Sequence, residues 1–407
     1  MSSIKNFTNI SKQGFEILAT KIVTEAFHDG AGREQRPECY LRTREAVLDR
    51  IKNWIHDEHI QSQFLWICGS AGAGKSAIAG NIAKRCQTWR RMGGGFFFNR
   101  HAPRCNDETL LISTLVYQLT QSSQKLRRRV AKVIEKDNCI FARSPEAQML
   151  ALVVHPVNEM VNDSVNPHEI PNLIILDGLN KCINPKSQRQ ILKILVIAAE
   201  QIRIPFLFLI FSRTEQAIRD VFNQASMKSR SDRIVLNEDY HADVDIRIYL
   251  PSKFHDITLN HPARAHLPTP WPSGADIDRL VEKSSGQFIY ASTVIEFIES
   301  HHHSPADRLD IMFGLAPTPD EESPFAELDA LYRQMFSAVA TINVKDTLEV
   351  LSILFLADIK YVKNPHVPLS DFLAIILGEC ASSLVIFTPP LDCRKRTKGL
   401  SEFSMLP

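Results

Sequence analysis

Short apolar runs alternate with amphipathic segments along the first half of the chain. Four runs are apolar throughout and have the length of buried strands, at residues 64–68, 95–98, 173–176 and 206–211. Near them, apolar residues recur at helical spacing, which predicts helices over residues 45–55, 76–86, 108–119 and 188–201. This alternation predicts an α/β fold, with a mainly parallel sheet and helices on both faces.

The pattern changes to helices and loops after the apolar run at residues 234–236. Pro268, Pro270 and Pro272 interrupt the chain, and Ser273 with Asp276 then offers a helix cap. Residues 288–298 carry an apolar face at helical spacing, and further helices are predicted over residues 328–339 and 344–356. The second part of the chain is therefore expected to be mostly helical.

Composition and charge favour a soluble globular protein with more than one domain. The 407 residues exceed what one hydrophobic core usually serves, and 44% of them are hydrophobic. The 47 Lys and Arg nearly balance the 46 Asp and Glu, so no overall field favours nucleic acid or an anionic membrane. The eight cysteines show no zinc-site spacing, which favours reduced thiols in the cytoplasm. The apolar stretch at residues 372–391 contains Glu379 and a Pro-Pro pair, which favours a buried helix and strand over a membrane span.

A glycine-rich segment after the first strand fits G-x-x-x-x-G-K-[ST], the pattern of a phosphate-binding P-loop. The predicted nucleotide-binding residues are Gly69, Ser70, Ala71, Gly72, Ala73, Gly74, Lys75, Ser76 and Ala77. The glycines let backbone N–H groups turn toward phosphate oxygens, and the following helix adds its positive N-terminal end. Lys75 is expected to reach the β- and γ-phosphates, and the Ser76 hydroxyl to bind Mg²⁺. The sequence therefore predicts a site for ATP or GTP with Mg²⁺.

Two further charged residues follow strands of the predicted sheet. Asp177 ends the apolar run at residues 173–176 and is expected to bind Mg²⁺, the alternative being a turn-capping role before Gly178. Arg213 follows the fourth strand, where it could contact the γ-phosphate, the alternative being a surface arginine. We therefore predict that Lys75, Asp177 and Arg213 serve catalysis, and that Ser76 and Asp177 bind the metal.

Six sequence blocks, at residues 32–55, 64–79, 94–100, 173–182, 208–215 and 278–298, stand in a characteristic order and spacing. From about residue 26 to 339 the chain thereby resembles the fungal NACHT-domain proteins of the STAND class of P-loop NTPases. The resemblance implies a nucleotide-binding core, a helical domain, a winged-helix region and usually a C-terminal repeat array. It also implies that the nucleotide controls opening and self-association, in self/non-self recognition or cell death. We accordingly expect an N-terminal segment (1–35), a NACHT core (36–236), a helical domain (237–339) and a partial or divergent winged-helix region with a tail (340–407).

The chain departs from that family in two places. Where the family reads Asp-Gly-Leu-Asp-Glu-Cys, this sequence reads Asp177, Gly178, Leu179, Asn180, Lys181, Cys182. Loss of two carboxylates predicts slow or absent hydrolysis, and a lysine near Asp177 predicts weakened Mg²⁺ binding. The sequence ends at Pro407 with no repeat array, as expected of a truncated or decoy member.

The leading hypothesis is a signalling switch that binds ATP or GTP, hydrolyses it poorly, and can self-associate on activation. One alternative is a non-catalytic nucleotide-binding scaffold. Another is a small-molecule kinase or metabolic ATPase, which would need an acceptor-binding signature that the sequence after the core does not show. The hypothesis includes no specific nucleic acid and no membrane as partners.

Overall fold

The computed structural model describes residues 13–30, 38–100, 102, 104–163, 170–236, 240 and 242–314. The chain divides into two compact units, residues 1–302 and 303–407. The described part of the second unit contains helix α14 (Pro305–Gly314). The helices expected at residues 328–339 and 344–356, the apolar stretch at 372–391 and the winged-helix region at 340–407 lie outside the described residues. The expected domain boundaries stay predictions.

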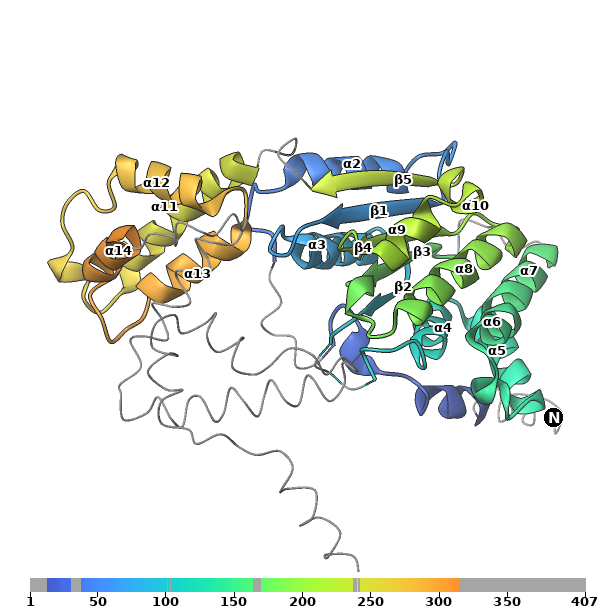
Figure 1. Ribbon diagram of the computed structural model, residues 1–407. Helices are drawn as coiled ribbons and strands as arrows, with labels where there is room; N and C mark the ends of the chain where they lie inside the picture. The colour runs from blue at the N-terminus through green and yellow to red at the C-terminus, as the bar shows by residue number, and fades with distance from the viewer. Residues whose placement is uncertain are drawn as a thin grey trace, which may run out of the picture. The chain divides into compact units, whose positions relative to one another are not determined.

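Five parallel strands form one sheet in the order β2-β3-β4-β1-β5 (Figure 1). They are β1 (Phe64–Gly69), β2 (Met92–Phe97), β3 (Leu173–Asp177), β4 (Leu207–Ser212) and β5 (Ser231–Leu236). The α/β fold and the four predicted strands are confirmed, with ends shifted by at most a few residues. The sequence pattern predicts no strand at β5, where Asp232 and Arg233 are charged. In the structure both residues are exposed, as suits an edge strand.

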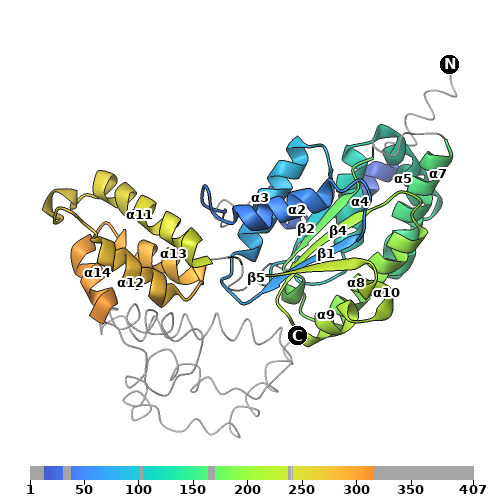
Figure 2. The ribbon, with the colours of Figure 1, turned by 90° about the horizontal axis from the view of Figure 1, so that it is seen from above.

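Alternate residues of the strands pack on opposite faces of the sheet. In β1, Phe64 and Trp66 belong to one buried cluster, whereas Leu65 and Ile67 belong to the other. The second cluster includes residues of α2 (Glu45–Ile55) and α3 (Lys75–Thr88). The first includes residues of α4 (Leu111–Gln121), α5 (Gln124–Lys136), α7 (His155–Asn162), α8 (Pro185–Gln201) and α9 (Gln216–Phe222). Covering on both faces, visible in Figure 2, explains why the strands are apolar throughout.

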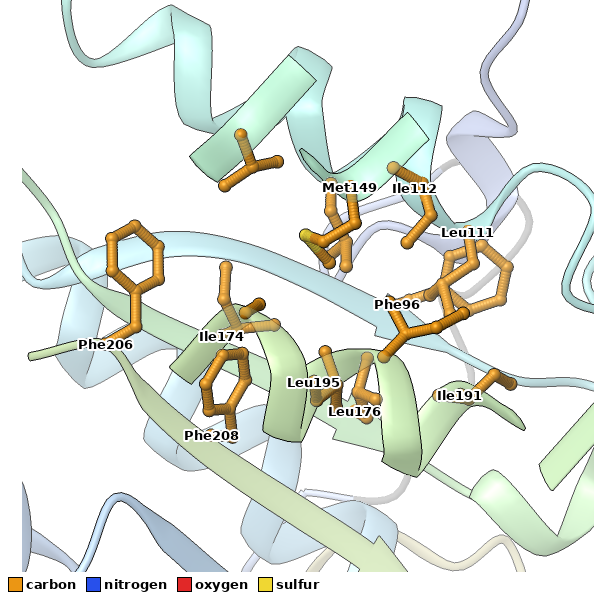
Figure 3. Packing of buried hydrophobic residues seen from close by; sticks show 14 of the residues in the cluster. Phe96, Leu111, Ile112, Met149, Ile174, Leu176, Ile191, Leu195, Phe206 and Phe208 are labelled. Carbon is orange, nitrogen blue, oxygen red and sulfur yellow. The ribbon is translucent and has the colours of Figure 1, made fainter. Parts of the chain in front are cut away.

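The larger cluster fills the space between the sheet and the helices that follow β2 and β3. Figure 3 shows Phe96, Ile174 and Phe208 from the sheet against Met149 and Leu195 from the helices. Shorter elements complete this layer, namely α6 (Pro145–Met149), a π-helical turn (Leu150–Val154) and α10 (Ala225–Lys228). This packing gives the sheet a rigid support from which its terminal loops extend.

Strand β2 lies at an edge of the sheet, and a side chain pairs with its backbone. The Gln118 amide donates to the Gly95 carbonyl at 2.8 Å and accepts from the Gly95 N–H at 3.0 Å. A Cβ atom added at Gly93 would lie 2.7 Å from the Pro171 carbonyl oxygen. Glycine therefore allows close packing at this strand, while Gln118 satisfies backbone groups that an edge would leave unpaired.

The first unit also contains three helical segments in the region expected to be mostly helical, α11 (Ala242–Asn260), α12 (Gly274–Ser284) and α13 (Phe288–Ile298). The cap predicted before α12 is present, because Ser273 Oγ accepts from the Asp276 N–H while Asp276 accepts from the Ser273 N–H. Ala291, Val294 and Ile298 of the predicted apolar face of α13 are buried. No helix in the described ranges is both long enough and apolar enough to cross a membrane.

Candidate nucleotide site

The sheet brings the carboxyl ends of β1, β3 and β4 to one edge. Strand β4 lies between the other two, with Ser212 opposite Cys68 of β1 and Phe211 opposite Asp177 of β3. The residues that follow these strands therefore meet at the same edge, which is where open parallel sheets bind ligands. The sheet order thus collects the P-loop, Asp177 and Arg213, which lie far apart in the sequence.

The P-loop has the backbone conformation that its glycines permit. Gly72 and Gly74 have φ values of 76° and 84°, in the left-handed region where a side chain is disfavoured. Gly74 is the N-terminal cap residue of α3, which begins at Lys75. The Lys75 ammonium donates to the carbonyl oxygens of Gly69 at 2.9 Å and Ser70 at 2.5 Å, so the loop curls around its own lysine. This geometry suits a cradle for an anion at a helix N-terminus.

The charged residues predicted for the site act on one another electrostatically. Burial lowers the pKa of Lys75 to about 8, and the positive charges of Arg213 and Lys181 add to that effect, whereas Asp177 opposes it. Asp177 itself is only 3% exposed. The structure therefore brings Lys75, Asp177 and Arg213 together, as the sequence analysis predicts, with Lys181 as an additional cation.

The turn after β3 is fixed by backbone hydrogen bonds. Gly178 has φ 70° and donates its N–H to the Phe211 carbonyl at 2.9 Å. It precedes a single 3₁₀ turn, Leu179–Lys181, in which the Lys181 N–H donates to the Gly178 carbonyl at 2.7 Å. A left-handed residue directly after Asp177 thus turns the chain back at the sheet edge.

Asn180 has a structural contact that sequence reasoning missed. Its side chain is buried, and its Oδ1 accepts the backbone N–H of Arg213 at 3.0 Å. The turn after β3 therefore holds the end of β4, from which the Arg213 side chain extends. A carboxylate could accept the same hydrogen bond, so the contact does not depend on the amide. No sequence pattern signals this contact, because it joins residues 33 positions apart.

A second group of contacts, made by Trp66 and Ser212, also fixes the end of β4. The Trp66 indole N–H donates to Ser212 Oγ at 2.8 Å, and Ser212 Oγ donates to the Arg213 carbonyl at 2.9 Å. Phe222 stacks on Trp66 with ring centroids 4.4 Å apart. The backbone of Arg213 is thus held by both Asn180 and Ser212, which restricts the positions that its side chain can reach.

Arg44, which the sequence analysis does not select, connects the P-loop to the helical segments. It is 4% exposed, and its guanidinium donates to the Ala73 carbonyl at 3.0 Å. Its backbone N–H donates to Asp245 Oδ2 on α11 at 3.1 Å, and its guanidinium lies 5.0 Å from the ring centroid of Phe288 on α13. Burial lowers the pKa of this guanidinium, and Asp245 opposes that shift. The available signal, a single arginine before a helix, is too common to identify such a residue.

The first residues of α13 also lie against the P-loop. A Cβ atom added at Gly72 would lie 2.3 Å from Ile289 Cγ2 and 3.9 Å from Gln287 Oε1. Most of the predicted apolar face of α13 is buried, whereas Ile289 is 37% exposed and packs beside this glycine. The loop therefore meets the helical segment without intervening structure.

The side chains present fit a nucleotide and Mg²⁺. The loop offers backbone N–H groups and Lys75 to phosphates, while Ser76 and Asp177 offer the oxygen ligands that Mg²⁺ prefers. Within the described ranges, no group of three or more His, Cys, Asp or Glu side chains could hold a metal ion. Phosphate oxygens and water would therefore supply the remaining Mg²⁺ ligands. The roles assigned to the site residues stay predictions.

Comparison with known proteins supports a relation to NACHT proteins. Residues 42–213 match the family model described as Nephrocystin 3, N-terminal. This NACHT-related match covers somewhat less than half of the chain and lies within the region of expected resemblance. It includes the P-loop and Asp177 and ends at Arg213. A search of curated proteins finds no match to the chain.

Proposed function

We propose that the protein is an ATP- or GTP-dependent signalling switch of the NACHT and STAND type, with impaired hydrolysis. The observation that carries the proposal is the buried Arg44, which contacts the P-loop at Ala73 and both helical segments at Asp245 and Phe288. A phosphate that rearranges the loop would change these contacts. The binding energy of the nucleotide could then bias the helical segments between two positions.

The site residues have separate roles in this proposal. The P-loop N–H groups and Lys75 bind the phosphates, and Arg213 contacts the γ-phosphate. Ser76 and Asp177 would hold Mg²⁺, which would supply positive charge to the phosphates. By resemblance to fungal NACHT proteins, we place the switch in the cytoplasm and expect self-association on activation, in self/non-self recognition or cell death.

A non-catalytic nucleotide-binding scaffold is a second candidate function. It is favoured by the turn after β3, where Asn180 Oδ1 is already bonded to the Arg213 backbone and Lys181 replaces a carboxylate. Neither side chain can remove a proton from water. A scaffold would bind nucleotide without a change in the helical segments, whereas a switch would change them.

Calorimetry of nucleotide binding tests the cradle. We expect Lys75→Ala to weaken ATP binding by about a hundredfold or more, because a buried charge-assisted contact to phosphate is lost. Lys84→Ala is the matched control, since Lys84 lies on the same helix, is 60% exposed, and pairs only with Glu38 among the ion pairs described. Equal ATP affinity in the wild type and a folded Lys75→Ala variant would show that the cradle is wrongly assigned.

Hydrogen exchange distinguishes the switch from the scaffold. The apo, diphosphate and triphosphate states should differ in protection over α11 and α13, because both contact Arg44. Arg44→Gln should reduce the differences in α11 and α13 while the P-loop peptides still respond to nucleotide. Identical exchange in all three wild-type states, with nucleotide bound, would favour the scaffold.

A further inference from the structure

The turn after β3 places a further cation, Lys181, at the edge of the sheet that carries the P-loop. A Cβ atom added at Gly178 would lie 2.9 Å from Lys181 Cδ, 3.1 Å from its Cε and 3.3 Å from its Nζ. The lysine side chain therefore folds back over Gly178, the residue that follows Asp177. The left-handed turn at Gly178 makes room for it, because a side chain at position 178 would occupy the same space.

The charges around this edge of the sheet are unequal. Four cations lie here, namely Lys75, Arg213, Lys181 and the Arg44 that contacts Ala73, against two carboxylates, the buried Asp177 and the Asp245 that pairs with Arg44. Lys181 lies in the turn directly after Asp177, at the edge where β1 and β4 also end. Such a set attracts a polyanion and repels a divalent cation. A triphosphate can therefore find near Lys181 part of the positive charge that Mg²⁺ would otherwise supply.

We propose that Lys181 is a phosphate-binding residue, and that it makes triphosphate binding by this protein largely independent of divalent metal. The inference rests on the proposed nucleotide site. It adds Lys181 to the phosphate-binding residues and adds metal-independent binding to the properties of the site. Lysine suits this role because its ammonium is a compact charge on a flexible stem that can move from Gly178 toward an incoming phosphate. Asp177 and Ser76 still allow Mg²⁺ to bind, but the metal becomes dispensable for affinity.

Calorimetric titration with ATP, in Mg²⁺ and in EDTA, tests the proposal. The wild type should bind with similar affinity in both buffers. Lys181→Met should weaken binding in EDTA on the order of tenfold, and Lys181→Glu by more, since it adds a negative charge beside Asp177. Both variants should bind better in Mg²⁺ than in EDTA. Lys181→Arg should retain most of the binding in EDTA, because it keeps the charge.

Lys193→Met on α8 is the matched control, because this lysine is exposed and lies away from the turn. Thermal melting of each variant establishes that it is folded. If wild-type binding required Mg²⁺, or if Lys181→Met bound as tightly as the wild type in EDTA, the role of Lys181 would be refuted while the nucleotide site stood. If the wild type bound ATP in neither buffer, the proposed function itself would fail.

Discussion

Two loops at the same edge of the sheet fit the expected pattern of a nucleotide site to different degrees. The loop after β1 keeps every fixed position of its phosphate-binding pattern and has the expected backbone, with Gly72 and Gly74 in the left-handed region. The turn after β3 keeps Asp177, but its next polar positions hold Asn180 and Lys181. In the proposed function, the first loop would act mainly through its backbone, whereas the second would depend on particular side chains.

This difference shows how binding and hydrolysis can be lost separately. A backbone cradle survives as long as its glycines, its lysine and the following helix remain. Water activation needs a side chain that accepts a proton, and an amide or an ammonium cannot do so. The turn can nonetheless keep its structure, because Asn180 still bonds to Arg213 at 3.0 Å. A switch with this pair of loops would be held in its triphosphate-bound state.

The largest expected effect comes from restoring the carboxylates of the second loop. The double variant Asn180→Asp, Lys181→Glu should cleave ATP about a hundred to ten thousand times faster than the wild type, the usual range for general-base assistance. The new carboxylate at position 180 can accept the Arg213 N–H with one oxygen and leave the other for water. Single-turnover cleavage in Mg²⁺ measures the rate directly.

Two comparisons make this experiment decisive. Asn180→Asp alone separates the contribution of position 180, and Glu159→Gln is a control because Glu159 on α7 pairs with Arg129 on α5. A wild-type rate as fast as that of the double variant would contradict the idea that the second loop has lost its catalytic function. Another carboxylate would then have to activate the water.

Much of the core could be predicted from sequence because its signals are local. Apolar runs at β1, β3 and β4 and the capping box at Ser273 are written in consecutive residues, and the structure has them where they are expected. Strand β5 is harder to predict, because half of its residues are exposed and because it pairs with β1, which is distant in the sequence. Patterns within a segment therefore predict the central strands and helices well, but they predict strands at the edges of the sheet less well.

The candidate site was predictable only in part, for the same physical reason. The P-loop, Asp177 and Arg213 each follow an apolar run, so their positions at strand ends could be expected. Arg44 lies 29 residues before Ala73, to which it donates, and 201 residues before Asp245. Its role depends on burial and on contacts between distant segments, which a single sequence does not reveal.

The next largest effect should come from a methyl group on the first loop. Gly72→Ala places a side chain at φ 76° and within 2.3 Å of Ile289 Cγ2. Backbone strain of this kind costs on the order of 1–3 kcal/mol, so a loop that relaxes away from the cradle should bind ATP about ten to a hundred times more weakly. Calorimetry measures the affinity, and hydrogen exchange over α13 should change in the apo protein as well. Unaltered affinity would mean that phosphate binding does not need this loop conformation.

A smaller effect is expected from pH. In the ligand-free protein the pKa of Lys75 is lowered to about 8, and bound phosphates should raise it, so binding above pH 8 takes up a proton. ATP affinity should therefore be nearly constant below pH 8 and fall by about tenfold per pH unit above it. Titrations in two buffers of different ionisation enthalpy measure the proton uptake. Lys75→Arg, whose charge does not titrate in this range, should bind with a much flatter pH profile, and an equally steep one would assign the proton to another group.

The smallest effect tests whether Gly72 matters for its backbone conformation and close packing, or only because it is a glycine. Gly80 lies within α3, eight residues after Gly72, but a Cβ atom added there would meet nothing within 4 Å. Gly80→Ala should stabilise the protein by about 0.5–1 kcal/mol, because alanine loses less conformational freedom than glycine in a helix. Urea unfolding measures the gain, and ATP affinity should stay unchanged.

The two glycine variants are then compared. If Gly72→Ala weakens ATP binding while Gly80→Ala leaves it unchanged, φ and packing at the loop, and not the loss of a glycine as such, determine nucleotide binding. A loss of affinity in Gly80→Ala would instead mean that the interior of α3 contributes to the cradle.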